Sequence, residues 1–136
     1  IHKTYMCIVN GHPNKEGIIN FPIGRDIKIR NKMMHKTKGR DSLTHYKVIE
    51  YFEDTSLVQA EPVTGRTHQI RVHMTGIGHC LIGDAMYGKT SKYIKRQALH
   101  AAKLTFTFKE IPYTFESPLP DDFLKALHSL RIATKH

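Results

Sequence analysis

The sequence has 136 residues and a mass of 15.6 kDa, and 40% of the residues are apolar, which is enough for one packed core and too little for two domains. Lys and Arg number 21 against 12 Asp and Glu, so the net charge is +9 and the pI is about 9.7. That charge attracts polyanions such as nucleic acid, anionic membranes or acidic proteins, and does not choose among them. No apolar run approaches a membrane span of about eighteen residues, and the first residues lack the apolar centre of an export signal, so we expect a soluble protein.

The chain is expected to begin with β-structure. Thr4–Val9 is β-branched and apolar, and it ends at a turn cluster, Asn10-Gly11-His12-Pro13. A second strand is expected at about Gly17–Ile23, and the short loop before it favours a hairpin with the first strand.

The segment Gly24–Arg40 is strongly basic, with one acid, Asp26. Its seven cations are Arg25, Lys28, Arg30, Lys32, Lys36, Lys38 and Arg40. Two interpretations stay open: a solvated connection, or an arm that follows RNA phosphates, with Lys28, Arg30 and Lys32 as candidate contacts. No aromatic residue lies among the cations, so this segment is not expected to stack on bases.

Two strands at about Leu43–Phe52 and Leu57–Pro62 are expected to pair antiparallel through a turn at Glu53-Asp54-Thr55-Ser56. A helix of two to three turns is expected to follow, because Thr67 fits the N-cap position and Gly76 fits the C′ position.

The last third of the chain returns to strands and ends in a helix. Leu104–Phe108 alternates and is expected to pair with a return strand at Tyr113–Glu116. A terminal helix begins near Asp121 and Asp122, whose charges suit a helix N-terminus, and its expected core stripe is Phe123, Leu124, Leu127 and Leu130. Cys7 and Cys80 lack a CxxC spacing, which fits reduced thiols in the cytoplasm or an organelle matrix.

Most catalytic patterns are missing from the sequence. His68, His73 and His79 do not have the spacing of metal ligands on one helix face, so no metal site is expected. There is also no serine elbow and no glycine-rich phosphate loop. The polar cluster from Arg66 to His73 follows a glycine turn, and it favours a nucleic-acid or phosphate-binding role over a solvated helix face.

The same cluster carries a resemblance to a known family. The run Thr64-Gly65-Arg66-Thr67-His68-Gln69-Ile70-Arg71-Val72-His73, followed by Ile77-Gly78-His79, Gly83-Asp84 and Tyr87-Gly88, resembles the signature of the RluA-type RNA pseudouridine synthases. Further matches in the family's order are Lys3-x-Tyr5, Gly11-His12-Pro13, Pro22-Ile23, Arg25-Asp26, Leu99-His100-Ala101, Ser117-Pro118-Leu119-Pro120 and Phe123. The resemblance covers essentially the whole chain.

The resemblance implies an α+β catalytic domain built on a mixed, mainly antiparallel sheet with flanking helices. It implies an isomerase that flips a uridine of ribosomal or transfer RNA into a pocket, attacks it with an aspartate, and rejoins the uracil through C5 without a cofactor. Tyr5 matches the tyrosine that packs against the flipped base, and Arg71 matches the arginine that pairs with the nucleophile. Supporting or RNA-binding roles are implied for Arg66, Thr67, His68, Gln69 and Ile70, a pocket wall for Leu99, and a structural turn for Asp84.

One part of the family pattern is missing. The family's nucleophile lies in a His-Arg-Leu-Asp run upstream of the Lys-x-Tyr strand, and no Arg-Leu-Asp occurs here. The aspartates that are present, Asp26, Asp41, Asp54, Asp84, Asp121 and Asp122, match other parts of the pattern. We therefore expect residues 1–136 to be the C-terminal part of a catalytic domain, inactive alone and poorly stable unless the missing segment or another chain covers its sheet. A non-catalytic RNA-binding module and a partner-completed assembly are the alternatives.

Overall fold

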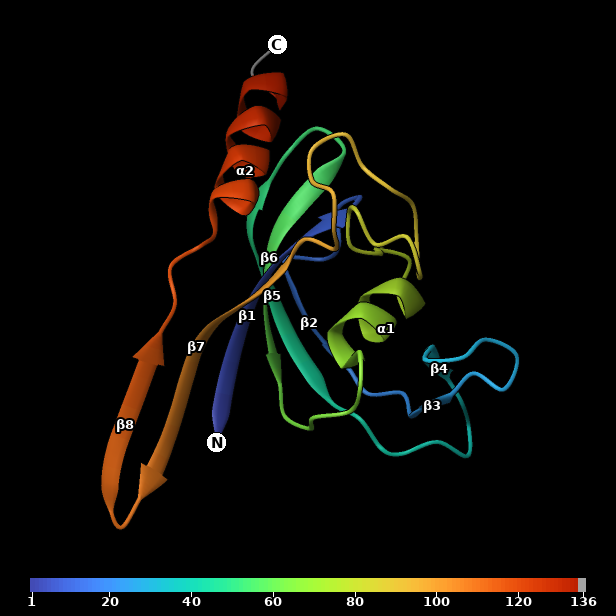
Figure 1. Ribbon diagram of the computed structural model, residues 1–136, viewed down its shortest axis with the longest axis vertical. Helices are drawn as coiled ribbons and strands as arrows, with labels where there is room; N and C mark the ends of the chain where they lie inside the picture. The colour runs from blue at the N-terminus through green and yellow to red at the C-terminus, as the bar shows by residue number, and fades with distance from the viewer. Residues whose placement is uncertain (135–136) are drawn as a thin grey trace.

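A computed structural model describes residues 1–134, and its centre is one twisted antiparallel sheet with a helix packed on each face (Figure 1). The strands are β1 (His2–Asn10), β2 (Glu16–Ile19), β3 (Ile23–Arg25), β4 (Met33–His35), β5 (Thr44–Tyr51), β6 (Thr55–Pro62), β7 (Leu99–Phe108) and β8 (Ile111–Glu116); the helices are α1 (Gln69–Gly76) and α2 (Asp121–Thr134). The sheet has the order β2-β5-β6-β1-β7-β8, and β3 and β4 form a separate ribbon. The expected α+β fold class is confirmed.

β1 separates two hydrophobic cores. Cys7 and Val9 point toward α1, whereas Ile8 points toward α2, because successive side chains of a strand alternate between its faces. All three residues are 0% exposed, so β1 is covered on both faces. Burial raises the pKa of the Cys7 thiol to about 12, and Cys7 and Cys80 are free thiols, as expected.

The predicted hairpin between the first two strands is wrong. β1 pairs with β6 and β7 in the middle of the sheet, and β2 pairs with β5 at its edge. The continuous apolar run Cys7-Ile8-Val9 is typical of a central strand that is buried on both faces. β6 and β7 occupy both hydrogen-bonding edges of β1, so β2 cannot pair with it. The second strand also ends early, at Ile19.

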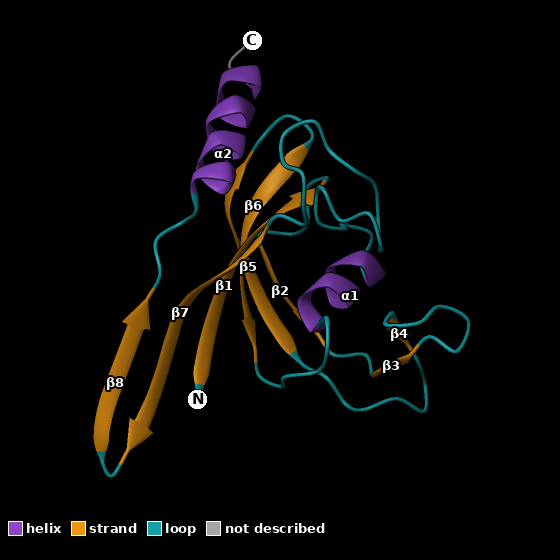
Figure 2. Ribbon diagram, in the orientation of Figure 1, coloured by secondary structure: helices purple, strands orange, loops and turns teal. Residues whose placement is uncertain are grey.

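The other predicted pairings are confirmed. β5 pairs with β6 and β7 pairs with β8, both antiparallel. β7 begins at Leu99, five residues before the predicted start at Leu104. The basic segment 24–40, in which no strand was predicted, contains most of the β3–β4 ribbon that stands beside α1 (Figure 2).

A β-bulge sets which face of β7 is apolar. Tyr5 lies opposite Ala101 and Thr4 lies opposite Lys103, so Ala102 is an extra residue. Without it, Leu104 and the alternate residues after it would change faces. The bulge keeps them on the face that carries Tyr5 and α1.

The β7–β8 hairpin projects beyond the rest of the sheet (Figure 1). The ring of Phe106 stacks on those of Tyr113 and Phe115, with centroids 5.4 and 5.9 Å apart. Phe108, Ile111 and Phe115 are 54–57% exposed, and β8 has no partner on its outer edge within residues 1–134. The hairpin therefore presents an apolar face and a free strand edge.

The turn at the tip of this hairpin predicts a stabilising change. Phe108 pairs with Ile111, and the two residues between them, Lys109 and Glu110, have φ angles of 50° and 66°. Asn and Gly adopt such angles with less strain, so Lys109→Asn with Glu110→Gly is expected to raise the free energy of unfolding by about 1 kcal/mol. Urea unfolding of the complete protein followed by circular dichroism measures this, and an unchanged or lower midpoint would contradict it.

Both predicted caps of α1 are wrong. The N-cap is His68, whose φ of 56° and ψ of 23° are left-handed, and it makes no side-chain cap. Gly76 is the last helical residue, and a Cβ there would lie 2.3 Å from the ring of Phe21. The C′ residue is Gly78, with φ of 88°, and the His79 N–H donates to the Met74 carbonyl at 2.9 Å in a Schellman motif.

α2 covers the face of the sheet opposite α1. Phe123, Ala126, Leu127 and Leu130 are buried, as an amphipathic helix requires, whereas Leu124 is 47% exposed and the prediction that it belongs to the core is wrong. Neither helix among residues 1–134 has the length and apolar content needed to cross a membrane.

Candidate active site

A cavity of about 390 Å³ opens between β1, β7 and the N-terminal end of α1. Its lining residues are Lys3, Tyr5, Pro62, Thr64, Gly65, Arg66, His68, Gln69, Ile70, Arg71, Gln97 and Leu99. The structure thus places together most of the site residues named from the sequence. The exceptions are Thr67, which lines the neighbouring cavity, and Lys28, Arg30 and Lys32, which line neither.

Arg71 is fixed by an acid that the sequence did not indicate as its partner. Its Nε donates to Asp84 Oδ2 at 2.8 Å and its Nη2 donates to Asp84 Oδ1 at 2.9 Å. The side chains are 12% and 1% exposed. Asp84 also accepts the Tyr87 N–H at 3.3 Å, which confirms the structural turn, and the carboxylate holds the guanidinium in one orientation.

Tyr87 connects the site to the basic ribbon. Its ring lies 4.9 Å from the Arg71 guanidinium carbon, and its Oη lies 2.7 Å from His68 Nδ1. The same Oη accepts the Met33 N–H at 2.9 Å, and Lys32 Nζ lies 5.5 Å from the ring centroid. Tyr87 therefore contacts Met33, the first residue of β4, and also the site residues His68 and Arg71.

His68 is held in an unfavourable backbone conformation. A left-handed non-glycine residue costs about 1 kcal/mol or more, so the surrounding contacts must over-determine it. Burial is the main cause that lowers the pKa of His68, and the neighbouring Arg71 lowers it further. The lowered pKa favours a neutral imidazole, whose Nδ1 contacts the Tyr87 hydroxyl at the edge of the cavity lining.

Gln69 organises the loop before α1. Its Oε1 accepts the Thr64 hydroxyl at 2.7 Å and the Arg66 N–H at 3.0 Å. Its Nε2 donates to the Leu43 carbonyl and to Thr44 Oγ1, both at 2.9 Å. The side-chain amide is fully used inside the protein, which favours the supporting role over an RNA contact.

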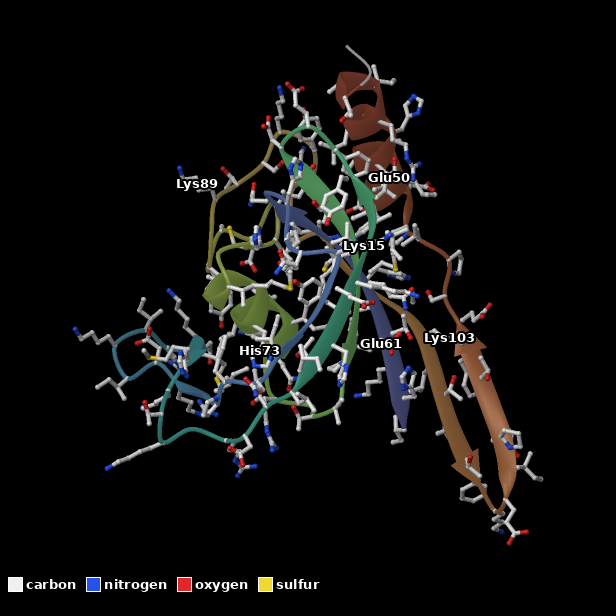
Figure 3. The ribbon with its side chains drawn as sticks, turned by 180° about the vertical axis from the view of Figure 1, so that it is seen from behind. Lys15, Glu50, Glu61, His73, Lys89 and Lys103 are labelled. Carbon is white, nitrogen blue, oxygen red and sulfur yellow. The ribbon has the colours of Figure 1, made fainter. Side chains whose placement is uncertain are left out.

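His73 continues this network on the inner face of α1 (Figure 3). Its Nε2 donates to the Phe21 carbonyl at 3.0 Å, because a carbonyl can only accept, and its Nδ1 lies 2.7 Å from Thr44 Oγ1. Nδ1 is therefore the acceptor of the Thr44 hydroxyl in a neutral imidazole. His73 is 0% exposed, and burial is the main cause that lowers its pKa.

The two lowered histidine pKa values predict a pH-dependent stability. Unfolding restores ordinary pKa values of 6.5, so below that pH the unfolded chain binds more protons than the folded one. The stabilisation is complete above pH 6.5 and is lost as the pH falls through the lower folded-state pKa values. The melting temperature, measured from about pH 8 to about pH 5, is expected to fall on the acid side, and less so in His73→Gln. A flat profile in the parent would contradict this.

Some lining residues had only weak sequence signals. Lys3, Thr64 and Gly65 lay in quoted motifs without a role, and Pro62 and Gln97 had none. No Asp or Glu lines the cavity within the part of the chain that the structure describes. The cavity instead combines the side chains of Tyr5, Ile70 and Leu99 with three cations, which suits a flat base carried by an anionic backbone.

Comparisons with known proteins point to one family. A family model described as RNA pseudouridylate synthase matches residues 1–75. The chain is 39% identical to the ribosomal large subunit pseudouridine synthase D of Nitrosomonas europaea and 42% identical to the uncharacterized RNA pseudouridine synthase YlyB of Bacillus subtilis. Each alignment covers 96% of this chain, but 41% and 45% of the relative, so the chain spans less than half of their length.

Solved structures agree on the fold. The human RNA pseudouridylate synthase domain containing 1 superposes with a TM-score of 0.76 at 27% identity, over 96% of this chain and 65% of that chain. The resemblance seen in the sequence is thus confirmed by comparisons of sequence and of structure.

Proposed function

The chain belongs to the RNA pseudouridylate synthase family, and on that premise we propose that it forms the C-terminal part of the catalytic domain of an RNA pseudouridine synthase. The proposed reaction isomerises uridine to pseudouridine in ribosomal or transfer RNA. One observation carries the proposal: a single cavity is lined by Tyr5, Arg71 and Leu99, which come from β1, α1 and β7. The location proposed with it is the cytoplasm or an organelle matrix, which suits two free thiols.

The cavity receives the flipped base between an aromatic and an aliphatic wall. Tyr5 packs against one side of the uracil, and Leu99 and Ile70 exclude water from the other. In the isomerisation the N1–C1′ bond breaks and the C1′–C5 bond forms, while C5 loses a proton and N1 gains one. Because flipping removes the base from its stack, these side chains must replace the lost stacking contacts.

Arg71 orients the nucleophilic aspartate, which this chain does not contain. Asp84 occupies two of the five N–H groups of the guanidinium, so three remain for a second carboxylate. A guanidinium fixed in this way can hold that carboxylate ionised and aligned. Asp84 itself is 1% exposed and does not line the cavity, so it is a support for Arg71 and not the attacking group.

The test uses the complete protein and RNA transcribed with uridine tritiated at C5. Release of tritium into water is the expected result, since C5 must lose its hydrogen when the new carbon–carbon bond forms. The alternative function, a non-catalytic RNA-binding module, is favoured by the absence of a carboxylate among the cavity-lining residues within 1–134. Salt-sensitive RNA binding without tritium release from ribosomal or transfer RNA would establish that alternative and refute the proposed reaction.

The exposed β7–β8 hairpin supports the proposal that residues 1–136 are only part of a domain. The apolar face of β7 and β8 lies on the same side of the sheet as Tyr5, and the relatives have more than half of their length outside the matched region. We expect a further segment of the domain, or another chain, to cover this face. Residues 1–136 alone should therefore melt in a broad, weakly cooperative transition. A sharp two-state transition of the isolated monomer in calorimetry would contradict this.

A further inference from the structure

A second cavity, of about 770 Å³, lies between the β3–β4 ribbon and the turn before α1. Five cations line it: Arg25, Lys36, Lys38, Arg40 and Arg66. No Asp or Glu belongs to its lining within the described residues, and neither does any Phe, Tyr or Trp. We call this cavity the cationic groove. Its composition suits a chain of phosphates better than a base or a peptide.

The walls of the groove are fixed by backbone contacts. The Ile23 N–H donates to the Arg40 carbonyl at 3.0 Å, and the Arg40 N–H donates to the Ile23 carbonyl at 2.9 Å. Gly39 packs so closely that an added Cβ would lie 2.6 Å from the Ile23 carbonyl group. The backbone of segment 36–40 is therefore held against β3, which keeps the attachment points of its cations beside the groove.

Two cations of the groove are themselves positioned. Lys36 Nζ donates to the Arg25 carbonyl at 3.1 Å, and Arg66 Nε donates to the Asp41 carbonyl at 3.0 Å. Both acceptors are neutral carbonyls, so each positive charge remains uncompensated. An anionic ligand would find these charges already oriented and would release their counterions on binding.

The groove is continuous with the candidate active site. Gly65, Arg66 and His68 line both cavities. Tyr87 adds a mechanical link, because its hydroxyl contacts Met33 of β4 and His68 at once. A strand lying in the groove would thus reach the cavity that contains Tyr5 and Arg71 without leaving the protein surface.

We propose that the cationic groove binds the phosphates of the RNA strand next to the nucleotide whose base enters the active-site cavity. This inference rests on the proposed function and adds the path of the substrate backbone. It keeps Arg66 as an RNA contact and adds Lys36, Lys38 and Arg40, which line the groove. It gives no phosphate contact in the groove to Lys28, Arg30 or Lys32, which do not line it. Since no Phe, Tyr or Trp lines the groove within residues 1–134, it positions the strand and does not read its sequence.

The experiment measures binding of a fluorescent single-stranded oligouridylate of about twelve nucleotides to the complete protein at several salt concentrations. The variant is Lys36→Gln with Lys38→Gln. We expect about three- to tenfold weaker binding and a salt slope smaller by about 1.4, the value for two lost phosphate contacts on a single strand. The matched control is Lys95→Gln with Lys125→Gln, which removes two exposed charges outside both cavities.

RNA binding tests the groove proposal, and tritium release tests the proposed reaction, so each can fail without the other. If only the groove variant binds RNA more weakly and with a smaller salt slope, the groove proposal is supported. This holds even if the complete protein releases no tritium, because then only the proposed reaction fails. An equal loss in the control variant would show a general effect of net charge and overturn the proposal. Unchanged binding by the groove variant would also overturn it, while tritium release by the parent would leave the proposed reaction standing.

Discussion

Arg71→Ala is expected to lower the rate of pseudouridine formation by the complete protein by about 10²- to 10³-fold, a loss typical of removing one preorganised hydrogen-bond donor. RNA affinity should change little, because the Arg71 side chain is 12% exposed and is already bound to Asp84 through two N–H groups. Single-turnover tritium release with saturating RNA measures the rate, and filter binding measures the affinity. If affinity collapsed while turnover per bound RNA survived, the orienting role of Arg71 would be wrong.

The control must separate chemistry from folding. Arg71→Ala leaves Asp84 as an unpaired buried carboxylate, and breaking such a pair costs about 3–5 kcal/mol. Arg71→Gln combined with Asp84→Asn removes both charges and keeps hydrogen-bonding groups of similar size. This double variant should fold and bind RNA yet remain as inactive as Arg71→Ala. Arg71→Lys should also be severely impaired, since an ammonium lacks the fork that binds two carboxylates at once.

The sequence predicted the local features of the fold well. Alternation and turn residues placed β5, β6 and the β7–β8 hairpin, because each of these pairs joins neighbouring segments. The partners of β1 were missed, since Tyr5 pairs with Ala60 and Ala101 and a contact over such separations leaves no local signal. The hint was the unbroken apolar run in β1, which is typical of a strand buried on both faces.

The ends of α1 show why a local rule can choose the wrong residue. Two glycines, Gly76 and Gly78, follow the helical run, and only the backbone decides which takes the left-handed position. Gly76 is required for a different reason, the close approach of the Phe21 ring from a distant segment. At the other end, Gln69 reaches back to the Arg66 N–H, and a long-range network fixes the helix start where Thr67 had been expected to cap it.

The site was predicted as a set of residues but not as a geometry. The family motif brought out Tyr5, Arg71 and Leu99, which line one cavity although they lie far apart in the sequence. The pairing of Arg71 with Asp84 and the position of Tyr87 between His68 and Met33 depend on the loop after α1. Irregular segments of this kind have no periodicity from which their contacts could be predicted.

Gln69→Leu is expected to lower the free energy of unfolding by about 3 kcal/mol, because it leaves several buried polar groups without partners. The amide serves Thr64, Arg66, Leu43 and Thr44 at once, and a leucine of similar size satisfies none of them. Loss of the Gln69 contact should also loosen the Thr44 hydroxyl, which donates to His73 Nδ1. Urea unfolding of the complete protein measures the change.

The matched control for Gln69 is Gln59→Leu on β6, whose amide donates to Glu61 in a half-buried site. It should cost less than about 1 kcal/mol, since water can replace the lost partner. Equal effects of the two substitutions would contradict a special role for the Gln69 network.

If Gln69→Leu unfolds the chain altogether, Gln69→Glu tests the same point: its carboxylate can still accept from Thr64 and Arg66, but it cannot donate to the Leu43 carbonyl. If Gln69→Glu unfolds with the same free energy as the parent, the hydrogen bonds that Gln69 Nε2 donates to Leu43 and Thr44 contribute nothing to stability. That result would refute the stabilising role of the Gln69 network.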